Sequence, residues 1–269
     1  MFKNGNKKLC LIAVIFTLVF LIKLKVGKEM LNPLFIDLVK NSNYLVALTG
    51  AGISTDSGLS DYRGPNGVWT RKDKGLEPLP SREITTVIPN KGHKALVSLF
   101  ELGKLQFLIS QNVDNLHLKS GIKPEKLVEL HGNHNLFKCI ACDSRFTAKE
   151  LNWDKSIYGN GYRKDPPHLD QPMCYCGGRI ISSIINFGDP MPKKELDLAF
   201  YHAKKTDVFL VIGSSLVVHP AASLPLECYN NGGSVIIINK GETALDDIAL
   251  IKINDSAGTV LEELVKDLI

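Results

Sequence analysis

The chain has 269 residues, of which 44% are hydrophobic and 22% are charged. These proportions are ordinary for a globular protein, and the length suits one large domain or a large domain with a small module. Residues 1–29 hold six of the 32 basic residues and one of the 28 acidic residues, so residues 30–269 hold 26 basic and 27 acidic residues. The main part of the chain therefore has no basic excess for nucleic-acid phosphates, and its charge does not support nucleic-acid binding.

An uncharged and mostly apolar run covers residues 9–22, between lysines. As a helix this run would span about 21 Å, which is less than the ~30 Å hydrocarbon core of a bilayer. Snorkelling by Lys8 and Lys23 could extend its reach. Three interpretations stay open: residues 1–29 are an artefactual extension or disordered tail before a true start at Met30, a membrane anchor, or a cleaved signal.

Apolar runs of strand length recur along the rest of the chain, each followed by loop or helix signals. They cover residues 44–48, 105–110, 127–130, 208–212, 235–238 and 250–253. Helical signals occupy residues 33–40, 193–205 and 259–268. Buried runs that alternate with helical segments predict an α/β fold, in which a Rossmann-like parallel sheet carries helices on both faces.

A glycine-rich turn follows the first predicted strand, where residues 49–58 read Thr-Gly-Ala-Gly-Ile-Ser-Thr-Asp-Ser-Gly. A strand, a glycine turn and a helix start are the elements with which a backbone approaches a pyrophosphate, so Gly50 and Gly52 are expected to leave room for phosphates. A dinucleotide fingerprint needs Gly or Ala at position 55, where Thr55 stands. A plain dehydrogenase therefore fits poorly.

The most informative stretch of the chain lies between residues 111 and 142. Residues 111–117 read Gln-Asn-Val-Asp-Asn-Leu-His directly after one predicted strand, and residues 129–133 read Glu-Leu-His-Gly-Asn at the end of the next. Ligands of open α/β sheets bind outside the carboxyl ends of the strands, so both clusters fall where chemistry is usually done. The imidazole of His131 suits a general base at neutral pH, and the alternative is a histidine satisfied within the core.

Two close pairs of cysteines lie in a segment that interrupts the predicted sheet: Cys139 with Cys142, and Cys174 with Cys176. Four thiolates satisfy tetrahedral zinc with no open position, so the ion would be structural and would staple a segment too small for its own core. Thiolate ligands indicate a reducing compartment and hence a cytoplasmic location, and the alternative is a disulfide framework.

The spacing of the second cysteine pair is tight, because a single residue separates its two thiolates. Either the loop adapts to the ion, or a histidine such as His134 or His168 replaces one of the cysteines. We expect all four cysteines to be ligands.

Together these motifs resemble the sirtuins, the NAD-dependent protein deacylases, which carry a Gly-Ser-Ser-Leu segment like that at residues 213–216. The resemblance runs from about residue 32 to about residue 269, and residues 64–70 and 182–189 are most similar to the branch often called class IV. The chain departs from the family pattern at Ser60 and Tyr62, where proline and phenylalanine are usual, and in the spacing of its second cysteine pair.

The resemblance implies a domain organisation in four segments. Residues 1–29 are the hydrophobic, lysine-flanked N-terminal segment. Residues 30–137 and 183–269 are the two parts of a Rossmann-like NAD-binding domain. Residues 138–182 are a small zinc-binding module inserted between them.

Sirtuins transfer an acyl group from a lysine side chain to NAD, which releases nicotinamide and forms O-acyl-ADP-ribose. The resemblance implies that His131 is the catalytic base, that Asn112 binds ribose or an ordered water, and that Asp114 accepts from the nicotinamide carboxamide. Arg63 would pair with a phosphate and Asp61 would orient it. The cofactor contacts implied are Gly50, Ala51, Gly52, Thr55, Asp61, Tyr62, Arg63, Trp69, Gln111, Asn112, Asp114, His131, Gly213, Ser214, Ser215, Asn239, Lys240 and Ala257.

The acyl-lysine peptide of a sirtuin lies as an added strand between two loops, which here correspond to Phe187, Gly188 and Asp189 and to Val217 and Val218. The tyrosine and arginine pair of sirtuins that prefer succinyl groups is missing after Trp69, so acetyl or a longer apolar acyl group is expected. Two alternatives stay open: mono-ADP-ribosyl transfer or NAD hydrolysis by the same pocket, and a non-catalytic NAD or ADP-ribose sensor.

Overall fold

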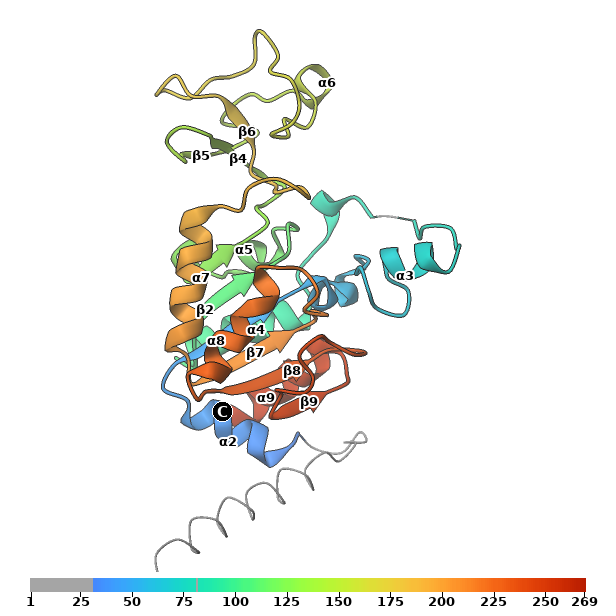
Figure 1. Ribbon diagram of the computed structural model, residues 1–269, viewed down its shortest axis with the longest axis vertical. Coiled ribbons are helices and arrows are strands. Elements are labelled where there is room, and N and C mark those ends of the chain that lie inside the picture. The colour runs from blue at the N-terminus through green and yellow to red at the C-terminus, as the bar shows by residue number, and fades with distance from the viewer. Residues whose placement is uncertain (1–30, 81) are drawn as a thin grey trace, which may run out of the picture.

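A six-stranded parallel sheet forms the centre of the computed structural model (Figure 1), which describes residues 31–80 and 82–269. Its strands are β1 (Leu45–Thr49), β2 (Leu105–Ser110), β3 (Leu127–Glu129), β7 (Val208–Ile212), β8 (Ser234–Ile238) and β9 (Ile251–Ile253). They lie in the order β3-β2-β1-β7-β8-β9, and every neighbouring pair is parallel. The predicted Rossmann-like sheet is confirmed, and each predicted strand boundary lies within one residue of an observed one.

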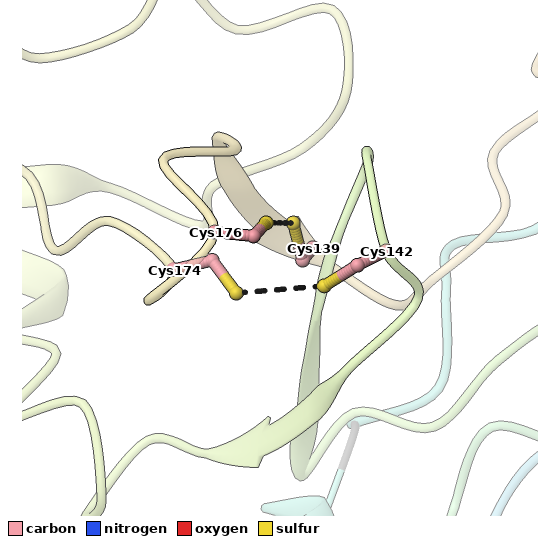
Figure 2. Close-up of side chains that lie close together, drawn as sticks. All are labelled: Cys139, Cys142, Cys174 and Cys176. Atoms are coloured by element: carbon pink, nitrogen blue, oxygen red, sulfur yellow. Dashed lines mark hydrogen bonds between the residues drawn. The ribbon is translucent and has the colours of Figure 1, made fainter.

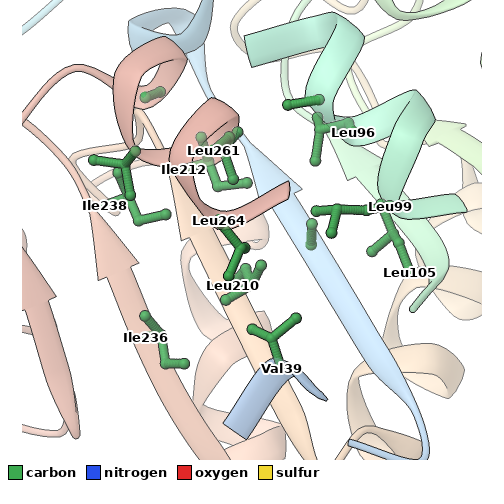
Figure 3. Close-up of a cluster of buried hydrophobic side chains, with 14 of the residues drawn as sticks. Val39, Leu96, Leu99, Leu105, Leu210, Ile212, Ile236, Ile238, Leu261 and Leu264 are labelled. Atoms are coloured by element: carbon green, nitrogen blue, oxygen red, sulfur yellow. The ribbon is translucent and has the colours of Figure 1, made fainter. Parts of the chain in front are cut away.

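Helices cover both faces of the sheet, as the sequence predicts. One face carries α2 (Pro33–Asn41), α4 (Lys91–Glu101) and α9 (Ala257–Leu268), and the other carries α7 (Lys193–Lys205) and α8 (Leu224–Asn230). Successive side chains of a strand point to opposite faces, so Leu210 and Ile212 of β7 join the first core while Phe209 and Val211 join the second. Figure 3 shows the first core, where Leu96 and Leu99 of α4 and Leu261 and Leu264 of α9 meet side chains of β7 and β8.

A smaller unit interrupts the main domain and projects from one end of the molecule (Figure 1). Its antiparallel sheet has the order β5-β4-β6, from β4 (Leu136–Cys139), β5 (Arg145–Thr147) and β6 (Ile180–Ser182), and it carries α6 (Lys155–Tyr158). Its apolar cluster is small and is centred on Phe137, Trp153 and Ile180 together with two of the cysteines. So small an apolar core contributes little to the stability of the unit, and small units of this kind usually bind a structural metal ion.

Short helical segments complete the chain: η1 (Ala51–Ser57), α3 (Val68–Asp73), η2 (Ile84–Thr86), α5 (Leu116–Ser120), η3 (Pro124–Lys126) and η4 (Ala221–Ser223). Among the described residues, no helix has the length and apolar character needed to cross a bilayer. The apolar run at residues 9–22, Cys10 and the candidate start at Met30 lie outside the described residues.

Candidate active site

Four loops meet at the carboxyl edge of the sheet, where β1 and β7 lie side by side and the strand order reverses. The loops after β1, β2, β7 and β8 begin at Gly50, Gln111, Gly213 and Asn239. Open α/β sheets bind their ligands at this switch point. The four predicted cofactor segments that follow these strands are therefore brought to one place by the topology.

The loops after β1 and β7 are packed in direct contact. The amide of Gly50 donates to the Ile212 carbonyl at 2.9 Å, and the amide of Gly52 donates to the Gly213 carbonyl at 2.8 Å. A Cβ at Gly52 would lie 2.7 Å from the Gly213 Cα, and a Cβ at Gly213, whose φ is +62°, would overlap the Ile53 amide. A side chain at Gly50 or Gly52 would therefore overlap the loop after β7, and the room that these glycines were expected to leave for phosphates stays a prediction.

A chain of hydrogen bonds joins the loop after β2 to η1. The Asn112 side-chain amide donates to the Gly50 carbonyl and to Ser54 Oγ, each at 3.2 Å, and Ser54 Oγ donates to Asp114 Oδ2 at 2.6 Å. The Leu116 amide donates to Asp114 Oδ1 at 3.0 Å. Asn112, Ser54 and Asp114 are all buried, so their polar groups are held in fixed directions.

Ser54 is a site residue that we did not predict. A signal was present in the sequence, since Ser54 is a hydroxyl next to the apolar Ile53, four residues after the first glycine of the turn. That hydroxyl is the link between Asn112 and Asp114.

His131 follows β3, and its ring is held by the loop after β2. Its Nδ1 lies 2.7 Å from the Gln111 carbonyl oxygen, which can only accept, so Nδ1 carries the proton and Nε2 keeps its lone pair. Burial lowers the pKa of His131, against the opposing effect of the hydrogen bond to Gln111. The imidazole is therefore neutral at pH 7, with Nε2 able to take a proton.

Further hydrogen bonds hold the loops after β1, β2 and β7 at this edge of the sheet. Gln111 Nε2 donates to Ser214 Oγ at 2.8 Å, which ties the loop after β2 to the loop after β7. Thr55 Oγ1 donates to the Gly52 carbonyl at 2.8 Å, and Ser215 accepts through its carbonyl from the Ala244 amide at 3.0 Å. Ala51 is half-buried at the start of η1.

The segment after η1 holds Asp61 and Arg63 in separate contacts. Asp61 Oδ1 accepts from the Gly64 amide at 3.0 Å and so closes its own turn, while Arg63 pairs with Asp73 at 2.8 Å in an exposed position. The roles expected of Arg63 and Asp61 toward a phosphate stay predictions. Burial raises the pKa of Asp61, and the Gly64 amide and the Lys240 ammonium oppose this.

Tyr62 and Trp69 lie on the outer part of this segment. Tyr62 is 53% exposed, and Trp69 is half-buried in α3, with Lys72 Nζ 5.4 Å from its ring centroid. Helix α3 stands away from the main sheet in Figure 1.

The residues expected at the adenosine end are Asn239 and Lys240, after β8, and Ala257. The Asn239 amide donates to the Ile253 carbonyl at 3.0 Å, and the Asn239 side chain turns toward the Lys240 and Gly241 carbonyls. Lys240 is exposed, whereas Ala257 is buried as the first residue of α9.

The two loops expected to bind the peptide both expose apolar side chains, Phe187 at 78% and Val217 at 54%, while Val218 is half-buried. The loop that contains Phe187 follows β6 and passes against the segment after β3, where the Ile185 amide donates to the His131 carbonyl at 2.9 Å. Gly132 has a φ of +81°, and a Cβ there would overlap the Ser183 carbonyl, so only glycine permits this close approach.

The sulfur atoms of the four paired cysteines all lie within 4.8 Å of one another (Figure 2). Cys139 Sγ is 3.5 Å from Cys176 Sγ, and Cys142 Sγ is 3.6 Å from Cys174 Sγ. A tetrahedron with Zn–S bonds of about 2.3 Å has edges of about 3.8 Å, whereas a disulfide needs about 2.05 Å. The four cysteines therefore fit one structural zinc ion.

Neither histidine considered as a replacement ligand joins this cluster. His134 Nδ1 lies 2.8 Å from the Val113 carbonyl, and His168 Nδ1 accepts from the Asp170 amide. The described residues bring only thiolates together at this point.

Comparison with known proteins agrees with this geometry. Residues 77–220 match the model of the Sir2 family. The chain is 40% identical to an NAD-dependent protein deacetylase of Thermodesulfovibrio yellowstonii over 246 residues, which are 85% of this chain and 92% of that protein. It is 35% identical to an NAD-dependent protein deacetylase of Thermotoga maritima, over 85% of this chain and 96% of that one. A solved structure of Sir2 with a p53 peptide and NAD+ superimposes with a TM-score of 0.69 at 33% identity, covering 88% of this chain and 98% of that chain.

Proposed function

Because the chain belongs to the Sir2 family, we infer that it is an NAD-dependent protein deacetylase, with an acyl-lysine peptide or protein as its second substrate. The structural observation that carries this function is the neutral imidazole of His131, whose Nδ1 is held by the Gln111 carbonyl at 2.7 Å. That contact leaves Nε2 as a base at the carboxyl edge of the sheet, where the loop after β2 also holds the buried Asn112 and Asp114.

NAD supplies the acyl acceptor, a ribose whose bond to nicotinamide is broken in the reaction. The residues of the chain bind and orient the two substrates and move one proton. His131 Nε2 takes that proton from a ribose hydroxyl, and burial favours the neutral ring from which it starts. Hydrogen bonds to Ser54 hold the side chains of Asn112 and Asp114 in place. These side chains therefore need to move little to stabilise the positive charge that develops on the ribose.

The roles of individual residues are part of this proposal. Gly213 and Ser214, with Gly50 to Thr55, hold the phosphates and ribose, while Asn239, Lys240 and Ala257 lie toward the adenosine. Phe187 to Asp189 and Val217 to Val218 hold the peptide. The four cysteines hold one structural zinc ion, which takes no part in the chemistry because four thiolates leave no open position.

We also propose a finer assignment. Residues 64–70 and 182–189 favour the class IV branch, and the missing tyrosine and arginine pair favours acetyl or a longer apolar acyl group. The domain boundaries are residues 30–137 and 183–269 for the NAD-binding domain and 138–182 for the zinc-binding module. Four thiolates that hold zinc favour a reducing, cytoplasmic compartment.

The test is a panel of acylated peptides incubated with NAD, scored by mass for deacylated peptide and by nicotinamide release. His131→Ala should lower deacylation by ~10²-fold or more while NAD binding stays nearly unchanged, because the ring acts as base. His168→Ala, in the insert, serves as the matched histidine control and should keep its turnover.

Other results would point elsewhere. ADP-ribosylated protein without deacylated peptide would indicate a transferase. NAD binding without any turnover would indicate a sensor. Near-normal turnover by His131→Ala would overturn the assignment of the base.

A further inference from the structure

Two tight turns face each other where the zinc-binding insert meets the peptide-binding loop. The first covers residues 162–165, in which the Asp165 amide donates to the Tyr162 carbonyl at 3.0 Å and the Tyr162 amide donates to Asp165 Oδ2 at 2.8 Å. Arg179 Nη2 donates to the Asp165 carbonyl at 2.6 Å and fixes this turn on the insert. Lys164 is the third residue of the turn, so its backbone position is set by the insert.

The second turn covers residues 186–189 and presents the exposed ring of Phe187. The Asp189 amide donates to the Asn186 carbonyl at 2.9 Å, and the Asn186 amide donates to Asp189 Oδ2 at 3.0 Å. Gly188 has a φ of +81°, which is the conformation that a type II turn requires at its third position. The direction in which Phe187 points therefore depends on how this turn is held.

Lys164 reaches across from the first turn to the second. Its Nζ donates to the Phe187 carbonyl at 3.2 Å and lies 4.0 Å from Asp189 Oδ1. The Lys164 side chain is 65% exposed, whereas the Asp189 side chain is only 1% exposed. An exposed ammonium group therefore lies next to an almost fully buried carboxylate.

Asp189 Oδ1 is buried and has no hydrogen-bond donor among the described residues. An unmet acceptor on a buried carboxylate costs free energy, and the ammonium of Lys164 is the cation that lies within ion-pair distance of it. The ammonium of Lys164 therefore offsets part of the cost of burying this carboxylate, whose other oxygen closes the 186–189 turn.

We propose that Lys164 is a positioning residue for the acyl-lysine peptide. Lys164 holds the 186–189 turn against the zinc-binding insert, and that turn binds the peptide. The proposal rests on the proposed function, since it takes that turn as part of the peptide site. The coupling runs further, because the Ile185 amide, one residue before the turn, is bonded to the His131 carbonyl. In this proposal the insert affects peptide binding through Lys164.

Kinetics of Lys164→Met test this role, since methionine keeps the length of the side chain and removes its charge. The KM for an acetylated peptide should rise about fivefold, the effect expected of one partly exposed charged hydrogen bond. The KM for NAD and kcat at saturating peptide should stay within about twofold, because the polar contacts of Lys164 among the described residues are to Phe187 and Asp189. Lys164→Arg should stay close to the unchanged protein, and Lys149→Met is the matched control, an exposed lysine of the insert outside both turns.

Asp189→Asn provides the partner half of a double-mutant cycle. If Lys164 acts through Asp189, the double variant should bind peptide no worse than Asp189→Asn alone. Additive losses, or a peptide KM for Lys164→Met equal to that of Lys149→Met, would overturn the proposal.

Hydrogen exchange at the Asp189 amide gives a readout that needs no activity. Lys164→Met should speed this exchange, and Lys149→Met should not. If Lys164→Met speeds this exchange but the unchanged protein deacylates no peptide, then Lys164 holds the turn and the proposed function is wrong. If the unchanged protein deacylates peptide but Lys164→Met changes neither the exchange nor the peptide KM, then the proposed function stands and the role of Lys164 is wrong.

Discussion

Glu129 is a buried acid two residues before the proposed catalytic base. Asn133 Nδ2 lies 2.8 Å from its Oε1 and 3.1 Å from its Oε2, and the same nitrogen lies 2.8 Å from Asn115 Oδ1. Burial raises the pKa of Glu129 to about 7, with Asp114 adding to the rise and Asn133 and Arg145 opposing it. The carboxyl group therefore changes its charge close to neutral pH, inside the network that joins the segment around His131 to the loop after β2.

Glu129→Gln should weaken the dependence of stability on pH. A carboxyl group whose folded pKa lies above its unfolded value of 4.5 contributes stability that is complete below 4.5 and is lost as the pH rises through about 7. The loss amounts to at most roughly 3 kcal/mol. Urea unfolding at pH 5 and pH 8 should therefore show that the free energy of unfolding of the variant rises relative to that of the unchanged protein between these two pH values. The same change with pH in both proteins would contradict the assignment.

At the scale of elements, the loop before β6 shows how the short spacing of the second cysteine pair is tolerated. The Gly177 amide donates to the Cys174 carbonyl at 2.8 Å and the Cys174 amide donates to the Gly178 carbonyl at 3.0 Å, so residues 174–178 form a closed turn. Gly177 has a φ of +79°, and a Cβ at Gly178 would lie 2.5 Å from Cys139 Sγ. Two glycines thus bring both thiolates of this pair to the cluster.

Cys142→Ser should release zinc and destabilise the insert, because metal binding and folding of so small a unit are coupled. The zinc content should fall from about one ion per chain to well below one, and the Tm should fall as well. Cys228→Ser is the matched control, since Cys228 lies buried in α8 outside the cluster. Retained zinc in Cys142→Ser would exclude that cysteine as a ligand.

For the whole molecule, three neutral histidines lie on the two sides of the sheet: His93 and His117 are buried, and His202 is half-buried. Burial lowers the pKa of His93 to about 4 and that of His117 well below its usual range. Burial, together with Lys205 and Lys126, lowers the pKa of His202 to about 4, and its ring stacks on Phe107 with centroids 3.6 Å apart. Each ring must gain a proton when the chain unfolds in acid.

Stability should therefore fall as the pH drops below 6.5. The folded pKa of each histidine lies below its unfolded value of 6.5, so the unfolded chain binds more protons and is favoured between pH 6.5 and about 4. His202→Phe keeps a ring on Phe107 and cannot titrate, so its free energy of unfolding should fall less over this range. Denaturation at several pH values measures the slope, and an unchanged slope in the variant would contradict the role of His202.

The six strands of the main sheet, the helices α2, α7 and α9 and the residue types of the site could be predicted from the chain alone, because they depend on local patterns. Helix α4 and the strands of the insert were not predicted. Runs such as residues 208–212 are apolar throughout, which indicates a strand buried on both faces. The spacing of the cysteines predicts a four-thiolate cluster, and polar residues after β2 and β3 mark the edge where the site lies.

Contacts between distant segments were decided only by the tertiary structure. Gly52 faces Gly213, Ser54 links Asn112 to Asp114, Arg63 pairs with Asp73, and Lys164 reaches Asp189. Sequence patterns cannot predict these contacts, because the order of the strands in the sheet and the packing of the loops at its edge decide which residues meet. The sequence by itself determined the elements and the chemistry available, and packing between the loops decided which groups meet.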